Sequence, residues 1–164
     1  MSRLRNLYIG RSGQMAVMAE FLARSYNVAV PEVDRGDDVF VVEDGSVDFW
    51  RIQVKTAFAV KATSTRRGVG AYTAQFRVPL EQLRAPGGAE LSYIFVVRHE
   101  DRWKEFVIRK RADLHSELAQ GLIGKQARKN LLLHLSFSDR SLLCNGRDWQ
   151  AHRDDWSAWP PLSL

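Results

Sequence analysis

The sequence predicts one mixed α/β domain. Its segments follow the order helix, strands, short helix, strands, helix, which is typical of a mixed central sheet flanked by helices. The chain has 164 residues, 45% of them hydrophobic, enough for a single core of ordinary size. The sequence contains neither a dinucleotide-binding glycine fingerprint nor a regular strand–helix–strand repeat, so a doubly wound parallel sheet is not expected.

The N-terminal half is expected to begin with a helix and to continue as strands. Ser12 is a candidate N-cap, and the helix from 13 to about 25 has apolar residues at i, i+3, i+4 and i+7, the spacing of one buried face. The residues of that face are Met15, Met18, Ala19 and Leu22. An extended segment, a polar loop, two strands and a cationic loop are expected at about 27–31, 32–37, 38–42, 47–57 and 61–70.

The C-terminal half is expected to complete the sheet and to end in a packed tail. Strands are expected at about 71–78, 91–97, 103–108 and 131–137, a helical turn at 79–84 and a helix at 112–122. The basic segment 124–130 is either a connector or a solvated helix end, and 131–137 is expected to be the last strand. Three tryptophans, Trp149, Trp156 and Trp159, favour a tail packed on the domain over a base-stacking platform.

Cysteine content and hydropathy bound the location of the protein. The single cysteine, Cys144, excludes an intramolecular disulfide and is expected to be a buried thiol. With only four histidines, a structural zinc site is disfavoured. Neither a secretory signal nor an apolar run of about 18 residues is visible. We therefore expect a soluble, cytoplasmic protein with no membrane partner.

The charge distribution favours a polyanionic partner. The formal net charge is +5. Residues 32–48 hold seven acidic residues and one basic residue, whereas 49–80 hold six basic residues and no acidic one. A small acidic cluster followed by a basic stretch suits a metal held beside a phosphate backbone. Chance segregation of charges over short windows is the alternative.

A hairpin in the middle of this region would bring polar side chains together. If Asp44-Gly45 is at the centre of a loop of two or four residues, paired positions sum to 89 and Asp38 lies opposite Arg51. Asp38 then shares a sheet face with Gln53 and Lys55, because alternate side chains of a strand point the same way. A carboxylate, an amide oxygen and an ammonium would converge. A loop of odd length would separate them, leaving an ordinary turn and a solvated lysine.

Three short motifs occur in an order that is known from a nuclease family. They are Gly13-Gln14, Asp34-Arg35-Gly36-Asp37-Asp38 and Ile52-Gln53-Val54-Lys55. A leading helix, a loop, an aspartate opening a strand, a tight hairpin and a strand ending in x-Lys resemble the PD-(D/E)XK nuclease superfamily. Many restriction endonucleases and archaeal Holliday junction resolvases have this fold. The resemblance covers residues 9–57 well and the later elements more loosely.

The resemblance implies a fold, a substrate and an assembly. It implies one restriction endonuclease-like domain over residues 1–164, with core motifs at 9–57 and a tryptophan-rich tail at 148–164 packed on it. It implies a metal-dependent endonuclease that hydrolyses the phosphodiester bonds of double-stranded or branched DNA with Mg²⁺ or Mn²⁺. Nucleases of this fold often act as dimers, so a homodimer is expected.

The resemblance also implies roles for single residues. Asp38 would be the central metal ligand, and Lys55 would stand beside the attacking water or the scissile phosphate. Gln53 would be the second ligand, as in a Gln-x-Lys variant known among intron-encoded homing endonucleases of this fold. The backbone carbonyl of Val54 would join them, and Gln14 would support the site from the first helix. The candidate contacts to the nucleic-acid backbone are Arg51, Lys61, Arg66 and Arg67.

The chain departs from the family pattern at three positions. Gln14 and Gln53 stand where most relatives have carboxylates, and Asp37 stands in place of a proline. The candidates for a further carboxylate are Asp34, Asp37 and Glu20. Glu20 lies about 240° around the helix from Gln14. Its spacing to Arg24 favours a surface ion pair instead.

Three functions stay open at this point. The first is the metal-dependent nuclease. The second is a catalytically degenerate nucleic-acid-binding module on the same fold, because the two glutamines weaken metal binding. The third is a protein-interaction domain that uses its tail, and it predicts an exposed apolar patch around Trp156 and Trp159.

Overall fold

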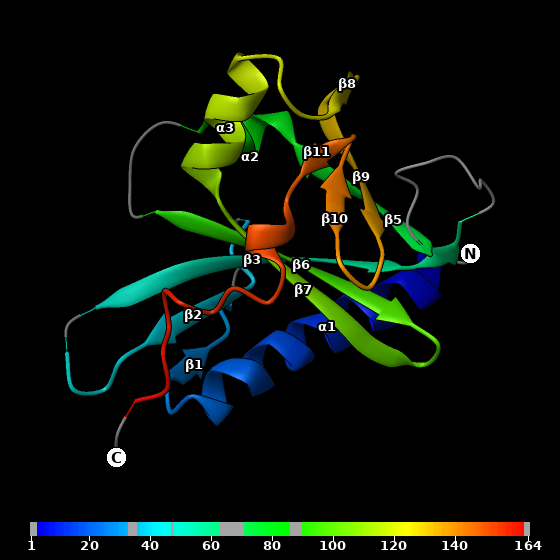
Figure 1. Ribbon diagram of the computed structural model, residues 1–164. Helices are drawn as coiled ribbons and strands as arrows, with labels where there is room; N and C mark the ends of the chain where they lie inside the picture. The colour runs from blue at the N-terminus through cyan, green and yellow to red at the C-terminus, as the bar shows by residue number, and fades with distance from the viewer. Residues whose placement is uncertain (1–2, 33–35, 47, 63–70, 86–89, 163–164) are drawn as a thin grey trace.

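The computed structural model describes residues 3–32, 36–46, 48–62, 71–85 and 90–162 (Figure 1). The helices are α1 (Arg3–Ala23), α2 (Leu80–Arg84) and α3 (Arg111–Ala119), with a 3₁₀ turn at Gln150–His152. The strands of the first sheet are β1 (Asn27–Ala29), β2 (Val39–Val42), β3 (Phe49–Phe58), β6 (Leu91–His99) and β7 (Arg102–Lys110). The strands of the second sheet are β4 (Val60–Lys61), β5 (Tyr72–Pro79), β8 (Lys125–Ala127), β9 (Asn130–Phe137), β10 (Leu142–Cys144) and β11 (Arg147–Asp148).

The two sheets differ in topology. The first has the order β1-β2-β3-β6-β7, with β3 and β6 parallel and its other neighbours antiparallel. The second has the order β11-β10-β9-β5-β4, with β8 added to β9, and is antiparallel throughout. The predicted mixed α/β domain is confirmed. The expectation that 131–137 is the last strand is wrong, because β10 and β11 follow it, and part of the basic segment 124–130 forms β8.

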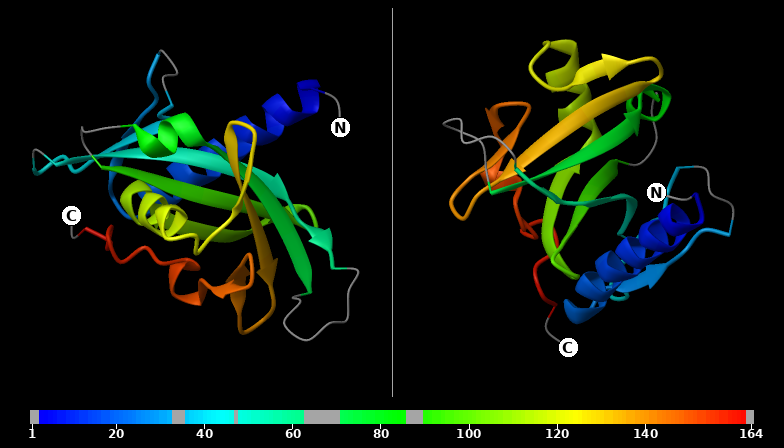
Figure 2. Two further views of the ribbon diagram at one scale, coloured as in Figure 1. Left: turned by 90° about the horizontal axis from the view of Figure 1, so that it is seen from above. Right: turned by 90° about the vertical axis from the view of Figure 1, so that its right-hand side faces the viewer.

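Both faces of the first sheet are covered (Figure 2). On one face, α1 packs Val17 and Phe21 against a cluster that includes Ile52 of β3. On the other face, Phe76 and the apolar residues of β9 pack against β6 in a second cluster. Every residue from Leu91 to Val97 is buried, as expected for a strand between two layers. Strand β5 instead alternates buried and more exposed residues, so the second sheet has one face toward the core and one toward solvent.

Helix α1 faces the sheet with a different stripe from the predicted one. It begins at Arg3, well before the candidate cap Ser12. Val17 and Phe21 are buried, whereas Met15 and Leu22 are 61% and 55% exposed. Both stripes have helical spacing, so the apolar pattern alone could not choose between them. The close contact of α1 with β3 at Gly13 and Thr56 sets which stripe of the helix faces the sheet.

The C-terminal tail packs on α1 and β7. Trp149 and Trp159 are buried, and the ring of Trp159 meets that of Phe21 edge to face at 5.2 Å. Trp156 lies 5.4 Å from the same ring. The described part of the tail therefore packs on the domain, and it lacks the exposed apolar patch around Trp156 and Trp159 that the protein-interaction hypothesis requires. Cys144 is buried, also as predicted. Among the described helices, none is long and apolar enough to cross a membrane.

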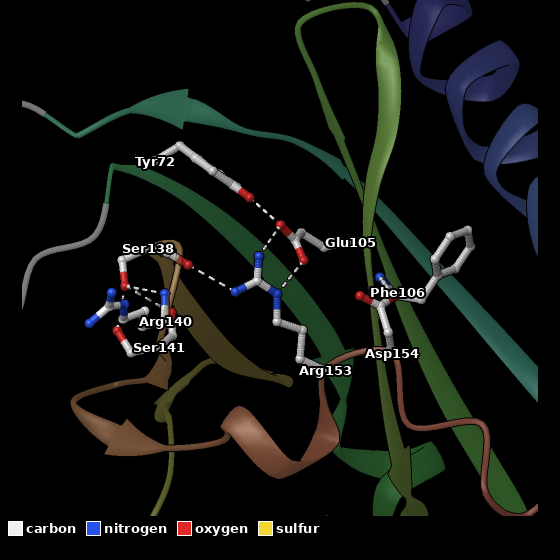
Figure 3. A network of polar contacts seen from close by, with 8 residues as sticks. All are labelled: Tyr72, Glu105, Phe106, Ser138, Arg140, Ser141, Arg153 and Asp154. Atoms are coloured by element: carbon white, nitrogen blue, oxygen red, sulfur yellow. Dashed lines mark hydrogen bonds and ion pairs between the residues drawn. The ribbon is translucent and has the colours of Figure 1, made fainter.

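A buried ion pair fastens the tail to both sheets (Figure 3). The guanidinium of Arg153 donates to both carboxylate oxygens of Glu105 on β7, at 2.6 and 2.7 Å, and to the carbonyl of Ser138 at 2.8 Å. The hydroxyl of Tyr72 on β5 donates to Glu105 as well. Burial and this contact raise the pKa of Tyr72, so the hydroxyl keeps the proton that it donates. Glu105 is 1% exposed, so its charge depends on these partners.

Glu105→Gln should destabilise the protein far more than Glu20→Gln. The first change leaves the Arg153 charge uncompensated in the interior, at a cost of roughly 3–5 kcal/mol. The second removes a partly exposed i,i+4 ion pair with Arg24, 2.7 Å long, and should cost under about 1 kcal/mol. The free energy of unfolding in urea measures both effects. Equal losses in the two variants would contradict a structural role for the Glu105 cluster.

Candidate functional site

The β2–β3 hairpin places the predicted residues on one face. The register pairs Val39 with Ile52 and Phe40 with Arg51, so paired positions sum to 91 rather than the expected 89. Val42 pairs with Phe49, so six residues separate the two strands, two more than in the longer of the expected loops. Because the shift is even, alternation is preserved, and Asp38 lies opposite Gln53. The predicted shared face of Asp38, Arg51, Gln53 and Lys55 follows from this register.

Asp38 is held in place from β3 and from α1. The backbone N–H of Val54 donates to Oδ2 of Asp38 at 2.7 Å, and Nε2 of Gln53 donates to the same oxygen. The backbone N–H of Asp38 donates to the carbonyl of Ile52 at 2.9 Å. Nε2 of Gln14 donates to the Asp38 carbonyl, so Gln14 reaches the site as predicted but contacts its backbone. The carboxylate is thereby fixed relative to β3.

Gln53 joins a chain of hydrogen bonds that the sequence did not predict. Its side chain is buried, and its Oε1 accepts a 2.7 Å hydrogen bond from Nε2 of Gln82 on α2. Gln82 also donates to the Gly36 carbonyl, and its Oε1 accepts from the Tyr93 hydroxyl at 3.0 Å. Burial raises the pKa of Tyr93, which keeps this donor protonated. Gln82 and Tyr93 belong to no motif of the site, so only the tertiary structure reveals their roles.

The chain of hydrogen bonds sets the orientation of the Gln53 amide. Its nitrogen faces Asp38 and its oxygen faces Gln82. From the sequence we expected the Gln53 amide oxygen, rather than its nitrogen, to converge with the Asp38 carboxylate. A cation ligated by both Asp38 and the Gln53 oxygen therefore requires this amide to turn.

Arg51 and Asp37 neutralise each other beside the site. Nε and Nη2 of Arg51 donate to the two carboxylate oxygens of Asp37, each at 3.0 Å. This fork geometry is the strong form of a charged hydrogen bond. The pairing occupies the Arg51 guanidinium, which we expected to contact a phosphate. It also occupies the Asp37 carboxylate, which was a candidate for a further metal ligand. Glu20, the other described candidate, pairs with Arg24 as the helix spacing indicated.

Lys55 lies in a pocket together with Gln53. The pocket measures about 570 Å³ and lies between β3, α2 and the beginning of α3. Its charged and amide side chains are Arg51, Gln53, Lys55, Glu81, Gln82 and Arg111. The structure thus gathers three of the four predicted face residues at one opening. Lys61 is exposed on β4 and paired with Tyr72. Arg66, Arg67 and Asp34 lie outside the described residues.

Two glycines permit the close approaches on which the site depends. A side-chain carbon at Gly13 would come within 2.8 Å of Cγ2 and 3.0 Å of Cβ of Thr56, so α1 touches β3 at this point. That contact brings the next residue, Gln14, to Asp38. Gly36 has a φ of 99°, which favours glycine, and passes directly over the amide of Gln82.

The donors at the site suit a hard cation with few protein ligands. In the described ranges, no group of three or more His, Cys, Asp or Glu side chains could hold a metal ion. The described pocket residues offer oxygen donors, from carboxylate and amide groups, and no thiol or imidazole. Mg²⁺ often keeps several waters and takes only one or two carboxylates together with substrate phosphates. Asp38 supplies one such carboxylate, and the Gln53 oxygen would join it only after the amide turns.

The fold is shared with a solved bacterial homing endonuclease. No family model and no curated protein matches the chain. Among solved structures, the chain is similar to a bacterial homing endonuclease, I-Ssp6803I, with a TM-score of 0.52 and 17% identity. The similarity covers 92% of this chain and 87% of the other. The two proteins therefore share a fold over nearly their whole length.

Gly13→Ala should destabilise the protein, whereas Gly10→Ala should stabilise it. At Gly13 the added methyl group meets Cβ of Thr56, which side-chain rotation cannot move away, and the overpacking should cost roughly 1–3 kcal/mol. At Gly10, on the same helix, the methyl group meets nothing within 4 Å. The higher helix propensity of alanine should then add about 0.5–1 kcal/mol. Urea unfolding measures both changes, and a stabilised Gly13→Ala protein would contradict the close contact of α1 with β3.

Proposed function

We propose that this protein is a metal-dependent nuclease of the PD-(D/E)XK type that hydrolyses DNA phosphodiester bonds. The observation that carries the proposal is the hydrogen bond between Asp38 and Gln53, which lines one pocket together with Lys55. The fold shared with a homing endonuclease supports it. The basic stretch that contains β3 and β5 supports a polyanionic substrate.

Lys55 has the central chemical role in this proposal. Its ammonium, on the same strand face as Gln53, orients the attacking water and offsets the negative charge that develops on the phosphoryl oxygens. The amide of Gln53, two residues before Lys55 on that face, is hydrogen-bonded to Asp38. Gln14 and the Val54 N–H hold Asp38 still, so that the reacting groups need little rearrangement when substrate binds.

Asp38 is the proposed anchor of a Mg²⁺ or Mn²⁺ ion. The Gln53 amide oxygen and the Val54 carbonyl are the further proposed protein ligands. A bound divalent ion polarises a phosphate oxygen and lowers the pKa of a coordinated water. The Gln53 amide already donates a hydrogen bond to the Asp38 carboxylate. This hydrogen bond has to break before the amide oxygen can bind the cation. We therefore expect weak metal binding that substrate phosphates strengthen.

A non-catalytic nucleic-acid-binding module is the second candidate. Its specific support is the hydrogen bond from Gln53 to Asp38, which occupies the carboxylate with an amide rather than an ion. In this alternative the chain binds DNA through its cations and cuts nothing. The protein-interaction hypothesis loses its support because Trp159 is buried in the packed tail. A homodimer stays a prediction.

Cleavage assays should separate the two candidates. Supercoiled, linear and branched DNA would be incubated with the protein and with Mg²⁺ or Mn²⁺. We expect cleavage by the parent, and a loss of about 100-fold or more in Asp38→Asn and Lys55→Met proteins. Lys104→Met is the matched control, because Lys104 is exposed on the edge strand β7, outside the described lining of the Lys55 pocket.

Each outcome of these assays has a defined meaning. Full activity in both site variants would refute the assigned site. A parent that binds DNA but cuts none of the three substrates would favour the binding module. Equal loss in the Lys104→Met protein would indicate a general effect of net charge instead of a role for Lys55.

A further inference from the structure

Lys55 is the point where three pockets meet. Besides the pocket at Gln53, it lines a pocket of about 580 Å³ between α1, β3 and β5, and one of about 630 Å³ over β5 and β9. The last two also share Thr56, Gln75 and His134. They therefore form one continuous groove, which we call the β5–β9 groove. It leads along the solvent face of the second sheet to the proposed catalytic lysine.

The groove is basic. Its titratable side chains are Lys55, Arg77, Lys125 and His134. Among its described lining residues there is no aspartate or glutamate. Its neutral polar side chains include Gln75 and Asn145. A polyanion that follows this groove meets cations and hydrogen-bonding groups and no repelling charge.

The strand register arranges these side chains in rows. Gln75 of β5 is paired with His134 of β9, and Arg77 is paired with Leu132, which is in turn paired with Lys125 of β8. Gln75, Arg77 and Lys125 are exposed, whereas Phe76 between them on β5 points into the core. Neighbouring strands are about 4.8 Å apart. The amide and imidazole thus form one row, and the two long cations form a second row beside it.

We propose that the solvent face of β5, β9 and β8 is the surface that docks double-stranded DNA. The strands enter the major groove, where Gln75 and His134 reach base edges. Arg77 and Lys125 contact the flanking phosphates, and the backbone of one strand passes Lys55. A two-stranded β-ribbon fits the major groove of B-DNA, and glutamine reads the edge of adenine there. The inference rests on the proposed nuclease function and adds the surface that selects the substrate.

Two features favour duplex DNA over other nucleic acids. Single strands are bound by exposed aromatic rings on which bases stack. In the described groove lining, Phe76 is buried and Phe58 lies beneath the guanidinium of Arg5, so neither ring is an open platform. The major groove of A-form RNA is too deep and narrow for strands to read. A duplex with an accessible major groove is the substrate that this surface fits.

A binding experiment without cleavage tests the docking surface. A labelled DNA duplex of mixed sequence would be titrated in EDTA at salt concentrations between about 50 and 200 mM. Arg77→Gln and Lys125→Gln should each weaken binding and should each reduce the slope of log affinity against log salt by about 0.9. Lys104→Gln is the matched control and should leave the slope unchanged. Each variant would first be shown to melt at the temperature of the parent.

The same experiment distinguishes failure of this inference from failure of the proposed function. If both groove variants keep the parent's slope while the parent cuts DNA, the docking surface is wrong and the nuclease stands. If the parent cuts nothing but the groove variants lose slope, the docking surface stands and the nuclease is wrong. Tighter binding to a duplex RNA or single strand of the same sequence than to the DNA duplex would overturn the choice of partner.

Selection of bound duplexes from a random-sequence pool tests the base contacts. The parent should enrich a motif, and Gln75→Ala should relax the preference at one or two positions while leaving the remaining positions unchanged. His134→Ala should relax an adjacent position, because the two side chains are paired across the strands. A parent that enriches no motif, or a Gln75→Ala protein that enriches the parent's motif, would overturn the assignment of Gln75 to base edges.

Discussion

The hydrogen bonds that Asp38 accepts from Gln53 and Val54 are the contacts on which the rest of the site depends. They join the beginning of β2 to the middle of β3, and β3 is fixed on its other side by parallel pairing with β6. Asp38 therefore cannot shift without disturbing the centre of the first sheet. A carboxylate held this rigidly loses little conformational entropy when it binds a ligand. Its hydrogen bond with the Gln53 amide, however, has to break first.

The second sheet extends this centre outward into the proposed binding surface. Its inner face closes the core against β6, and its outer face carries the basic β5–β9 groove. Strand β5 thus packs Phe76 into the core on one side and presents Gln75 and Arg77, the proposed DNA contacts, on the other. The buried Glu105–Arg153 pair fastens the tail to β7 and, through Tyr72, to β5. In this account the chemistry belongs to the first sheet and the choice of substrate to the second.

The sequence predicted which side chains share a face of the hairpin better than it predicted the surrounding structure. Placing Asp38, Gln53 and Lys55 on one face required only that the hairpin loop have an even number of residues. The loop is even, although the predicted register was wrong by two residues. The prediction of which face of α1 is buried was wrong. Two apolar stripes have the same helical spacing, and only the contact with β3 determines which of them faces the sheet. Gln82 could not be predicted, since its contact with Gln53 joins elements that no local pattern connects. The long strands β5 and β9 of the second sheet were predicted, whereas β8, β10 and β11 were missed because they are only two or three residues long.

The central claim is that Asp38 and Gln53 exchange their mutual hydrogen bond for a divalent cation. Nuclear magnetic resonance of the side-chain amide groups during a Mn²⁺ titration, in the presence of a DNA duplex, tests it most directly. We expect paramagnetic broadening to remove the Gln53 and Gln82 side-chain signals first, and Asp38→Asn to abolish the effect. Unbroadened Gln53 and Gln82 signals, or equal broadening in the Asp38→Asn protein, would show that Gln53 does not bind the cation with Asp38.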